Sequence, residues 1–194
     1  VQVNAGSLLV RTNETVGNIA GAGNILIGTG ATLTTGDTRS TTFSGQISNA
    51  GALTKAGSGT LTLSGSNAYA GATTVNDGVL EVTGSIGSLV VDVNAGGSLQ
   101  ADGSALADLA AVTLNGTGNL TLTGAEVIGS LASGSGTSTV TLNATGGATS
   151  SSFNVYGRSW MPLADLDIHW NGPATTQPLF ANDLVLNGLG SRMF

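Results

Sequence analysis

The sequence predicts an all-β protein, a parallel β-solenoid with coils of about 18 residues. Three observations support this prediction: a high glycine content, short motifs that recur at a common spacing, and short segments in which apolar and polar residues alternate. Glycine supplies 31 of the 194 residues and proline only three, and the glycines do not fall at every third position as collagen requires. Hydrophobic residues make up 40% of the chain, which is too many for a solvated disordered chain.

The common spacing appears in several unrelated motifs. Segments that match at a common offset of 18 in the numbering are Val75–Gly78 and Val93–Gly96, Thr121–Thr123 and Thr139–Thr141, and Asp165–Ile168 and Asp183–Leu186. A Gly-x-Gly-x-apolar-x-apolar motif begins at Gly21, Gly57 and Gly116, in steps of 36 and then 59. The first step is twice 18, and the second is three times 18 plus five. A period shared by unrelated motifs indicates a solenoid.

Alternation locates the strands within each coil. We expect strands at Asn24–Ile27, Thr60–Leu63, Leu89–Val93 and Asn119–Leu122, where every second side chain would enter a narrow interior. Glycine, asparagine and aspartate between them suit turns with positive φ. Because one coil cannot bury its own apolar face, successive coils must stack. At about 4.8 Å per coil, ten or eleven coils would form a rod roughly 50 Å long. A β-sandwich would explain the strands and turns but not the period.

The segment 104–111 interrupts this regularity. Its sequence, Ser-Ala-Leu-Ala-Asp-Leu-Ala-Ala, is briefly helical in character, and the surplus of five between the second and third Gly-x-Gly motifs falls here. We therefore expect a protruding turn or a helical patch on the rod.

Charge and cysteine content exclude several classes of function. Five Lys and Arg against eleven Asp and Glu give a net charge of −6, whereas nucleic-acid binding needs a basic face. Without cysteine there is no disulfide scaffold, thiolate metal site or cysteine nucleophile. No run approaches the roughly 18 apolar residues of a membrane helix. The chain begins with Val1 and shows no signal peptide, so we expect a processed chain or a fragment.

Residues 54–80 carry a longer pattern. It consists of Lys-x-Gly-x-Gly-x-Leu-x-Leu-x-Gly from Lys55, then Asn-x-Tyr-x-Gly-x-Thr-x-Val from Asn67, then Gly-x-Leu from Gly78. This pattern resembles the passenger-associated transport repeat of bacterial autotransporters, with weaker echoes over roughly 1–145. The resemblance implies a right-handed β-helix outside a Gram-negative cell. We expect at most a piece of such a passenger here.

The composition changes near residue 152. All three prolines, both tryptophans, both methionines and the one histidine lie in 153–194. We therefore divide the chain into a β-helix of passenger-type repeats at 1–152 and aromatic, proline-containing coils or a cap of the same solenoid at 153–194.

The second segment also holds the candidate contact residues. Asp165, Asp167 and His169 alternate with apolar residues, so on one strand they would share a face, where they could bind a metal or act on a sugar. The alternative is an ordinary outward polar face. The aromatic candidates for stacking on a sugar or partner are Tyr156, Trp160 and Trp170; the alternative is core filling or an end cap.

These observations predict a structural and adhesive segment of a secreted bacterial surface protein, a stiff stalk for attachment or for cell–cell and biofilm contact. We expect no enzyme activity, catalytic residue, metal site or cofactor, no nucleic acid partner and no membrane insertion by this segment. The expected partner is a host or bacterial surface protein or glycan. One alternative is an extracellular, pilus-like filament subunit that associates end to end. Another is a β-helix that binds or cleaves polysaccharide, with Asp165, Asp167 and Asp183 as the nearest approach to a carboxylate cluster.

Overall fold

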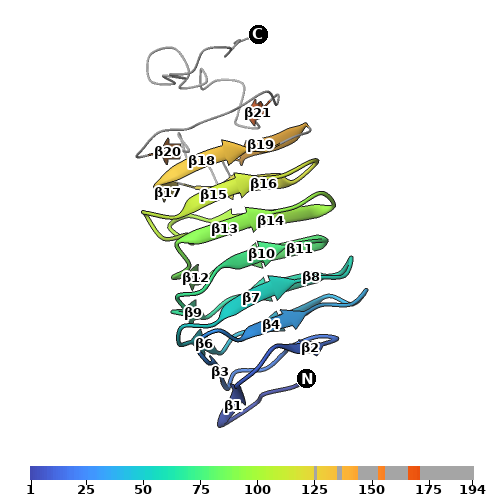
Figure 1. Ribbon diagram of the computed structural model, residues 1–194. Helices are drawn as coiled ribbons and strands as arrows, with labels where there is room; N and C mark the ends of the chain where they lie inside the picture. The colour runs from blue at the N-terminus through green and yellow to red at the C-terminus, as the bar shows by residue number, and fades with distance from the viewer. Residues whose placement is uncertain (125, 135–136, 144–152, 156–165, 171–194) are drawn as a thin grey trace.

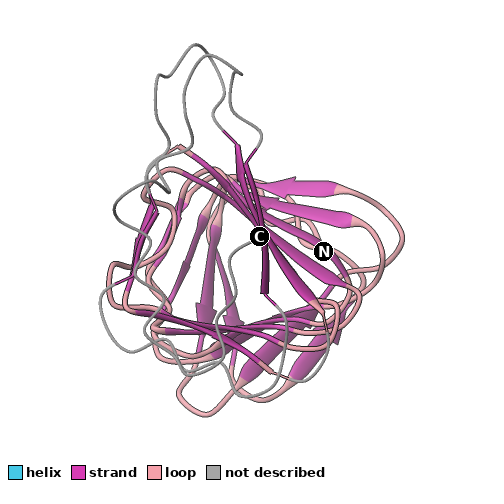
Figure 2. Cartoon of the chain, turned by 90° about the horizontal axis from the view of Figure 1, so that it is seen from above, coloured by secondary structure: helices cyan, strands magenta, loops and turns pink. Residues whose placement is uncertain are grey.

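The computed structural model describes residues 1–124, 126–134, 137–143, 153–155 and 166–170. The regular secondary structure within these residues consists of β-strands. They pair in parallel and belong to coils that are stacked along one axis (Figure 1). Seen along that axis, strands lie on several sides of one interior around which the chain winds (Figure 2). The predicted all-β parallel solenoid is therefore confirmed.

Two faces of the solenoid are seven-stranded parallel sheets, to which successive coils add neighbouring strands. Sheet I consists of β2 (Glu14–Val16), β4 (Thr32–Thr35), β7 (Ala52–Lys55), β10 (Thr73–Val75), β13 (Val90–Val93), β15 (Ala111–Leu114) and β18 (Ser130–Ser133). Sheet II consists of β5 (Thr41–Phe43), β8 (Thr60–Leu63), β11 (Gly78–Val82), β14 (Gly97–Asp102), β16 (Asn119–Thr123), β19 (Ser138–Asn143) and β21 (Leu166–Trp170).

The third face carries shorter strands. These are β1 (Ser7–Val10), β3 (Asn24–Ile27), β6 (Gln46–Ser48), β9 (Ser66–Asn67), β12 (Ser85–Ile86), β17 (Glu126–Ile128) and β20 (Phe153–Val155). Between β12 and β17 the backbone of Ala105 continues this face, because the Ile86 N–H donates to its carbonyl at 2.8 Å. Each coil thus runs from the third face through sheet I to sheet II.

Successive coils differ in length. In sheet I, Val90 pairs with Ala111, a step of 21 in the numbering, whereas Thr73 pairs with Val91, a step of only 18. The predicted spacing of 18 therefore lies near the short end of the observed range, which begins with the step of 17 from Ser7 to Asn24. The additional chain is accommodated at the corners, where it leaves the hydrogen-bond ladders of the sheets intact.

Two of the motif matches compare positions that are not equivalent. Asn24–Ile27 lies on the third face, whereas Thr60–Leu63 lies in sheet II, so the step of 36 does not count two coils. Thr121 pairs with Thr141 and not with Thr139, so the step between these two coils is 20 instead of 18. Strands with the same apolar alternation look alike in sequence whichever face they occupy.

The expected helical patch at 104–111 is wrong, and the protruding turn is correct. The step of 59 between the second and third Gly-x-Gly motifs spans three coils, whose steps are 19 from Thr60 to Val79, 19 from Val79 to Ser98 and 21 from Ser98 to Asn119. The surplus is therefore shared among them. Residues 107–110 form a turn in which the Ala110 N–H donates to the Ala107 carbonyl at 2.8 Å. No helix in the described part of the chain is long and apolar enough to cross a membrane.

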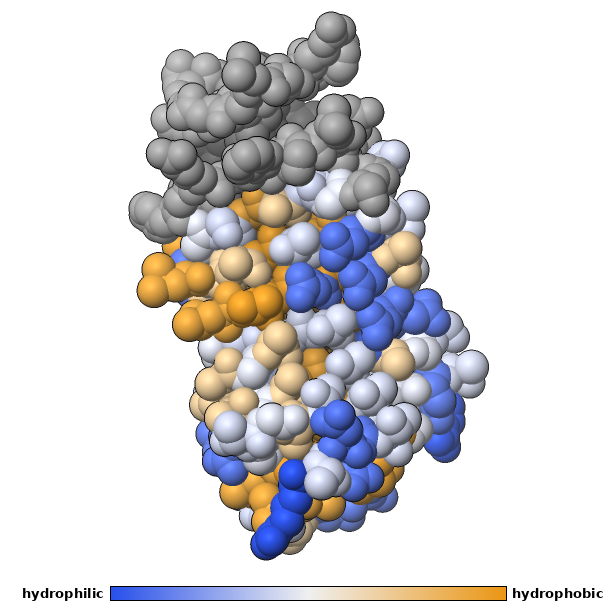
Figure 3. Space-filling view, viewed as in Figure 1, coloured by the Kyte–Doolittle hydropathy of each residue, from blue (hydrophilic) through white to orange (hydrophobic). Residues whose placement is uncertain are grey.

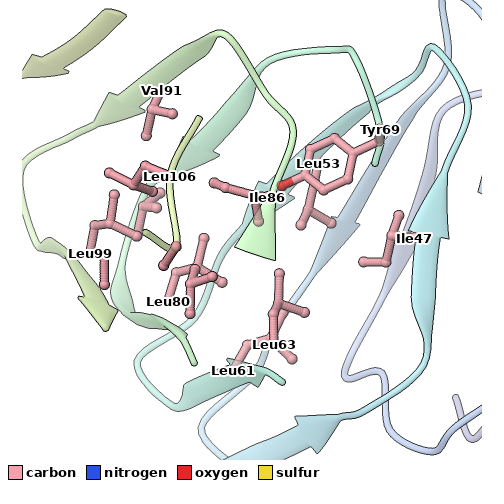
Figure 4. Packing of buried hydrophobic residues seen from close by; sticks show 14 of the residues in the cluster. Ile47, Leu53, Leu61, Leu63, Tyr69, Leu80, Ile86, Val91, Leu99 and Leu106 are labelled. Atoms are coloured by element: carbon pink, nitrogen blue, oxygen red, sulfur yellow. The ribbon is translucent and has the colours of Figure 1, made fainter. Parts of the chain in front are cut away.

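The interior is filled by columns of stacked apolar side chains. In sheet II, Leu61 pairs with Leu80 and Leu80 with Leu99, and all three are buried and lie one above another (Figure 4). The residues between them along each strand face outward, as strand alternation requires. A thin core of this kind gains apolar contact mainly from the coils above and below it.

A column of glycines follows sheet II at the corner with the third face. A Cβ atom added to Gly65 would lie 2.0 Å from the Gly45 carbonyl oxygen, and one added to Gly84 would lie 2.1 Å from that of Gly65. Each coil rests directly on the backbone of the coil below, which explains the last glycine of the Leu-x-Leu-x-Gly motif.

We expect Gly65→Ala to lower the free energy of unfolding by about 1–3 kcal/mol, as overpacking does elsewhere, because the backbone of two coils must separate. Chemical denaturation of the purified chain measures this change. Gly87→Ala is the matched control, since its added Cβ meets nothing closer than 3.4 Å. Equal stability of the two variants would contradict the close approach.

Candidate functional site

The structure reaches only part of the predicted contact site. Tyr156, Trp160 and Asp165 lie outside the described residues. Asp167, His169 and Trp170 belong to β21, which the structure describes as backbone paired with β19. Its register places Asp167 beside Thr139 and His169 beside Thr141, at positions whose threonines are half-buried on the outer side of sheet II. A role for these residues stays a prediction.

The described surface has few side chains of the kinds that the sequence suggested for sugar stacking or metal binding. Among residues whose side chains the structure describes, the aromatic ones are Phe43 and Tyr69, and both are completely buried. Within the same part of the chain, no group of three His, Asp or Glu side chains could hold a metal ion. Several polar side chains that make more than one hydrogen bond are instead buried.

Four such side chains lie within one segment, residues 53–82, and we call them the inter-coil polar residues: Lys55, Asn67, Tyr69 and Thr73. Lys55 is 1% exposed and occupies an inward position that Thr35 and Val75 occupy in the adjacent coils. Its Nζ donates to the carbonyls of Ala56 at 2.8 Å, Gly57 at 2.6 Å and Asp77 at 3.0 Å. The ammonium thus uses all three donors and joins two coils.

The buried position of Lys55 disfavours the positive charge of its ammonium group. Burial lowers the pKa of the Lys55 ammonium, and the carboxylates of Asp77 and Asp37 oppose this effect. Lysine is almost never fully buried unless it is paired, and here three backbone carbonyls provide the pairing. The sequence contained the signal, because Lys55 alternates with Leu53 in β7 and must therefore face inward.

Asn67 connects three coils through one amide group. Its Oδ1 accepts the Ile47 N–H at 2.9 Å, and its Nδ2 donates to the carbonyls of Gly65 at 2.9 Å and Ser85 at 3.1 Å. Ile47 lies one coil below and Ser85 one coil above. The amide therefore replaces backbone partners on the third face, where the strands are short.

Tyr69 fills the interior beside the same face. The ring lies near Leu53 and Ile86, with its hydroxyl pointing into the core (Figure 4), and this hydroxyl is 2.7 Å from the hydroxyl of Thr73. Burial raises the pKa of the Tyr69 phenol, and the Thr73 hydrogen bond partly offsets that rise. Tyr69 and Thr73 are completely buried, so this pair satisfies its own polar atoms.

Each residue that the Asn-x-Tyr-x-Gly-x-Thr-x-Val pattern specifies thus has a structural role. Gly71 supplies close approach, since an added Cβ would lie 2.3 Å from the Gly51 carbonyl oxygen. Val75 completes the inward set and is buried. Every second residue from Asn67 to Val75 therefore meets the interior or the coil below.

A ladder of asparagines continues above this segment, at the end of sheet I. The Nδ2 of Asn94 donates to Oδ1 of Asn76 at 2.7 Å, and that of Asn115 donates to Oδ1 of Asn94 at 3.0 Å. The Val-Asn-x-Gly motif therefore records side-chain stacking between coils as well as a turn. Gly78 and Gly96, with φ of 65° and 89°, supply the left-handed conformation in two of these turns.

Glu126 is a buried carboxylate that the sequence analysis missed. Its Oε2 accepts the N–H groups of Ala105 at 2.9 Å and Leu106 at 3.4 Å, and its Oε1 accepts that of Val127 at 3.2 Å. Burial raises the pKa of Glu126, although these three hydrogen bonds act in the opposite direction. Glu126 binds the backbone N–H groups that precede the turn at 107–110. Like Asn67, it accepts N–H groups from an adjacent coil.

Comparison with known proteins gives one match. Residues 53–82 match the family model described as passenger-associated-transport-repeat, the segment that contains the inter-coil polar residues. Searches of curated proteins and of solved structures found no significant match.

We expect Lys55→Met to lower the free energy of unfolding by about 1–3 kcal/mol, because three buried carbonyls lose their donor. Thr35→Val tests the equivalent position one coil earlier, where the threonine hydroxyl is buried and has no hydrogen-bond partner in the described part of the chain. That control should leave stability unchanged or raise it. Denaturant titration of both variants measures the free energy of unfolding. If Lys55→Met left this free energy unchanged, the ammonium would not hold the coils together.

The raised pKa of Glu126 also has a consequence for stability. A carboxyl whose pKa is higher in the folded state favours folding most when protonated, so its contribution declines as pH rises from below the ordinary glutamate pKa through the folded value. We expect wild type to lose stability relative to Glu126→Gln as pH rises above about 4, the ordinary glutamate pKa. Glu14→Gln removes an exposed carboxylate as the control. Parallel stability–pH profiles for wild type and Glu126→Gln would contradict this expectation.

Proposed function

A parallel β-solenoid that carries a passenger-associated transport repeat at 53–82 fits an autotransporter passenger β-helix, and from this premise we propose a structural and adhesive function for the chain. In this proposal the chain lies outside a bacterial cell, as part of a secreted or surface-displayed passenger. Its role is to form a stiff stalk and to contact a surface, and it is not catalytic.

The observation that carries this proposal is the set of contacts between coils within 53–82. Lys55 connects its coil to the next one and Asn67 connects its coil to both neighbours through buried hydrogen bonds, and the glycines bring the backbones into direct contact. A rod connected in this way resists bending because any bend must break contacts along one side. Stiffness is what a stalk requires when it holds a binding surface away from a cell.

The proposed partner is a surface protein or glycan of a host or of another bacterium. A low charge content, 8% of residues, supports contact with such surfaces, because little charged surface must be desolvated. The candidate residues Asp167, His169 and Trp170 in β21 remain proposals for the contacting side chains, together with Tyr156, Trp160 and Asp165.

Surface display and attachment test the proposal directly. Antibodies against the purified chain should label intact cells of the source bacterium, and protease added outside those cells should remove the label. Deleting residues 1–194 in frame should reduce attachment to abiotic, host-cell or bacterial surfaces by about tenfold or more while leaving growth unchanged.

The control restores the deleted segment with the six candidate contact residues replaced by alanine. Restored display without restored attachment places adhesion at those side chains. Label that resists external protease would contradict the extracellular location, and undiminished attachment after deletion would contradict the adhesive function.

A further inference from the structure

Three large apolar side chains are exposed together on two successive coils. They are Leu89, Val90 and Leu109, which are 51%, 48% and 72% exposed, and we call them the apolar ridge. The Ala111 N–H donates to the Leu89 carbonyl at 2.8 Å, so Leu109 lies one coil above Leu89, where the third face meets sheet I. Figure 3 shows apolar side chains that protrude together on one side of the upper described coils. Single exposed apolar residues are normal, whereas a contiguous patch marks an interaction site.

The solenoid itself does not require this exposure. Val90 pairs with Ala111, and Ala111 pairs with Ser130, so the coils above fill the same outward row of sheet I with small side chains. Leu109 lies in the turn at 107–110, which belongs to the additional chain of this longer coil. Large apolar residues therefore occupy outward positions at which the fold accepts alanine or serine.

The turn that carries Leu109 is held in place by hydrogen bonds. Glu126 accepts the N–H groups of Ala105 and Leu106 immediately before the turn, and a hydrogen bond from the Ala110 N–H closes it. A contact residue on a preorganised turn loses little conformational freedom when a partner binds. Leu109 is therefore well placed for a contact.

Carboxylates accompany the apolar ridge. Asp108 is exposed and directly precedes Leu109, and Asp92 is half-buried on the outer side of β13, two residues after Val90. The sequence has no lysine, arginine or histidine between residues 56 and 143, so these coils provide no basic side chain to neutralise either carboxylate. The apolar ridge is therefore an apolar surface in acidic surroundings.

We propose that the apolar ridge, together with Asp92 and Asp108, binds a basic amphipathic segment of a protein partner. The apolar face of that segment covers the three side chains of the ridge, and its Lys or Arg side chains lie beside the two carboxylates. Apolar burial supplies the attraction, and the opposite charges orient the segment and raise its association rate.

The same charges disfavour two other occupants. An anionic lipid surface repels carboxylates that lie at the contact. A second copy of the chain, placed ridge against ridge, brings the carboxylates of both copies together. The inference deepens the proposed function, on which it rests for display of the ridge outside the cell. It adds a contact surface apart from the six candidate residues and names a class of protein partner.

Calorimetric titration of the purified 194-residue chain with a synthetic helical peptide, leucine on one face and lysine on the other, tests this site. We expect saturable binding that weakens as salt rises, since exposed charges are screened. Leu109→Ser should weaken binding about tenfold, because a leucine side chain is no longer buried. Asp108→Asn should weaken it about two- to fivefold. Neither variant should lower the free energy of unfolding. Peptides with glutamate in place of lysine, or serine in place of leucine, should not bind.

Leu9→Ser and Glu14→Gln are the matched controls, because they change an exposed leucine and an exposed carboxylate in the first coil. Both should bind the peptide as the wild type does. A wild type that does not bind the peptide, or equal weakening by Leu9→Ser and Leu109→Ser, overturns the proposal. Binding to anionic lipid vesicles or dimerisation in sedimentation also overturns it if either depends on Leu109, since the ridge then has a different occupant.

Two results separate this inference from the proposed adhesive function. Attachment that is lost on deletion of residues 1–194, combined with no binding of the peptide, overturns the ridge as a binding site and leaves adhesion standing. Peptide binding that depends on Leu109, combined with undiminished attachment after the deletion, contradicts adhesion and supports the ridge as a binding site.

Discussion

The hydrogen-bond ladder between coils imposes a fixed rise of about 4.8 Å, and the other features of this solenoid must comply with it. Where the backbones of two successive coils pass the same corner at that rise, no side chain fits between them. Gly45, Gly65 and Gly84 therefore form a column there. The same rise stacks identical inward positions, which is why leucines of sheet II lie one above another. Glycine excess and apolar content are therefore two consequences of one spacing.

Short strands create a second requirement, because the backbone groups at their ends need other partners. A buried N–H or carbonyl without a partner is costly. Asn67 and Glu126 accept N–H groups on the third face, and Lys55 donates to carbonyls at the end of sheet I. These polar side chains lie in an otherwise apolar interior because they complete the ladder where strands alone do not.

The described surface is simple, and its informative features are distributed along the axis. Sheet II presents half-buried threonines and other small polar residues, whereas Arg11, Asp108 and Leu109, which lie in turns between the third face and sheet I, are exposed. A solenoid exposes each corner as a line, so residues many positions apart in sequence become members of one strip.

Sequence alone was sufficient for the all-β parallel solenoid, the passenger-type repeat at 54–80 and the alternation of inward and outward residues in the strands, because alternation and recurring motifs are local properties. The inward position of Lys55 was also readable from β7. The length of each coil was not, since corners take up additional chain without changing the motifs. Only the folded chain could therefore show that Asn24–Ile27 and Thr60–Leu63 lie on different faces.

The partners of buried polar groups were likewise decided by the tertiary structure. Glu126 meets the N–H of Ala105 in the preceding coil, and no local pattern indicates that contact. Arg11 and Asp108 lie in equivalent turns of the solenoid only because each intervening coil has its own number of residues while its strands stay in register. The sequence determined which residues face inward, through strand alternation. Stacking decided which residues meet, because the rise between coils is constant while the chain length of each coil is not.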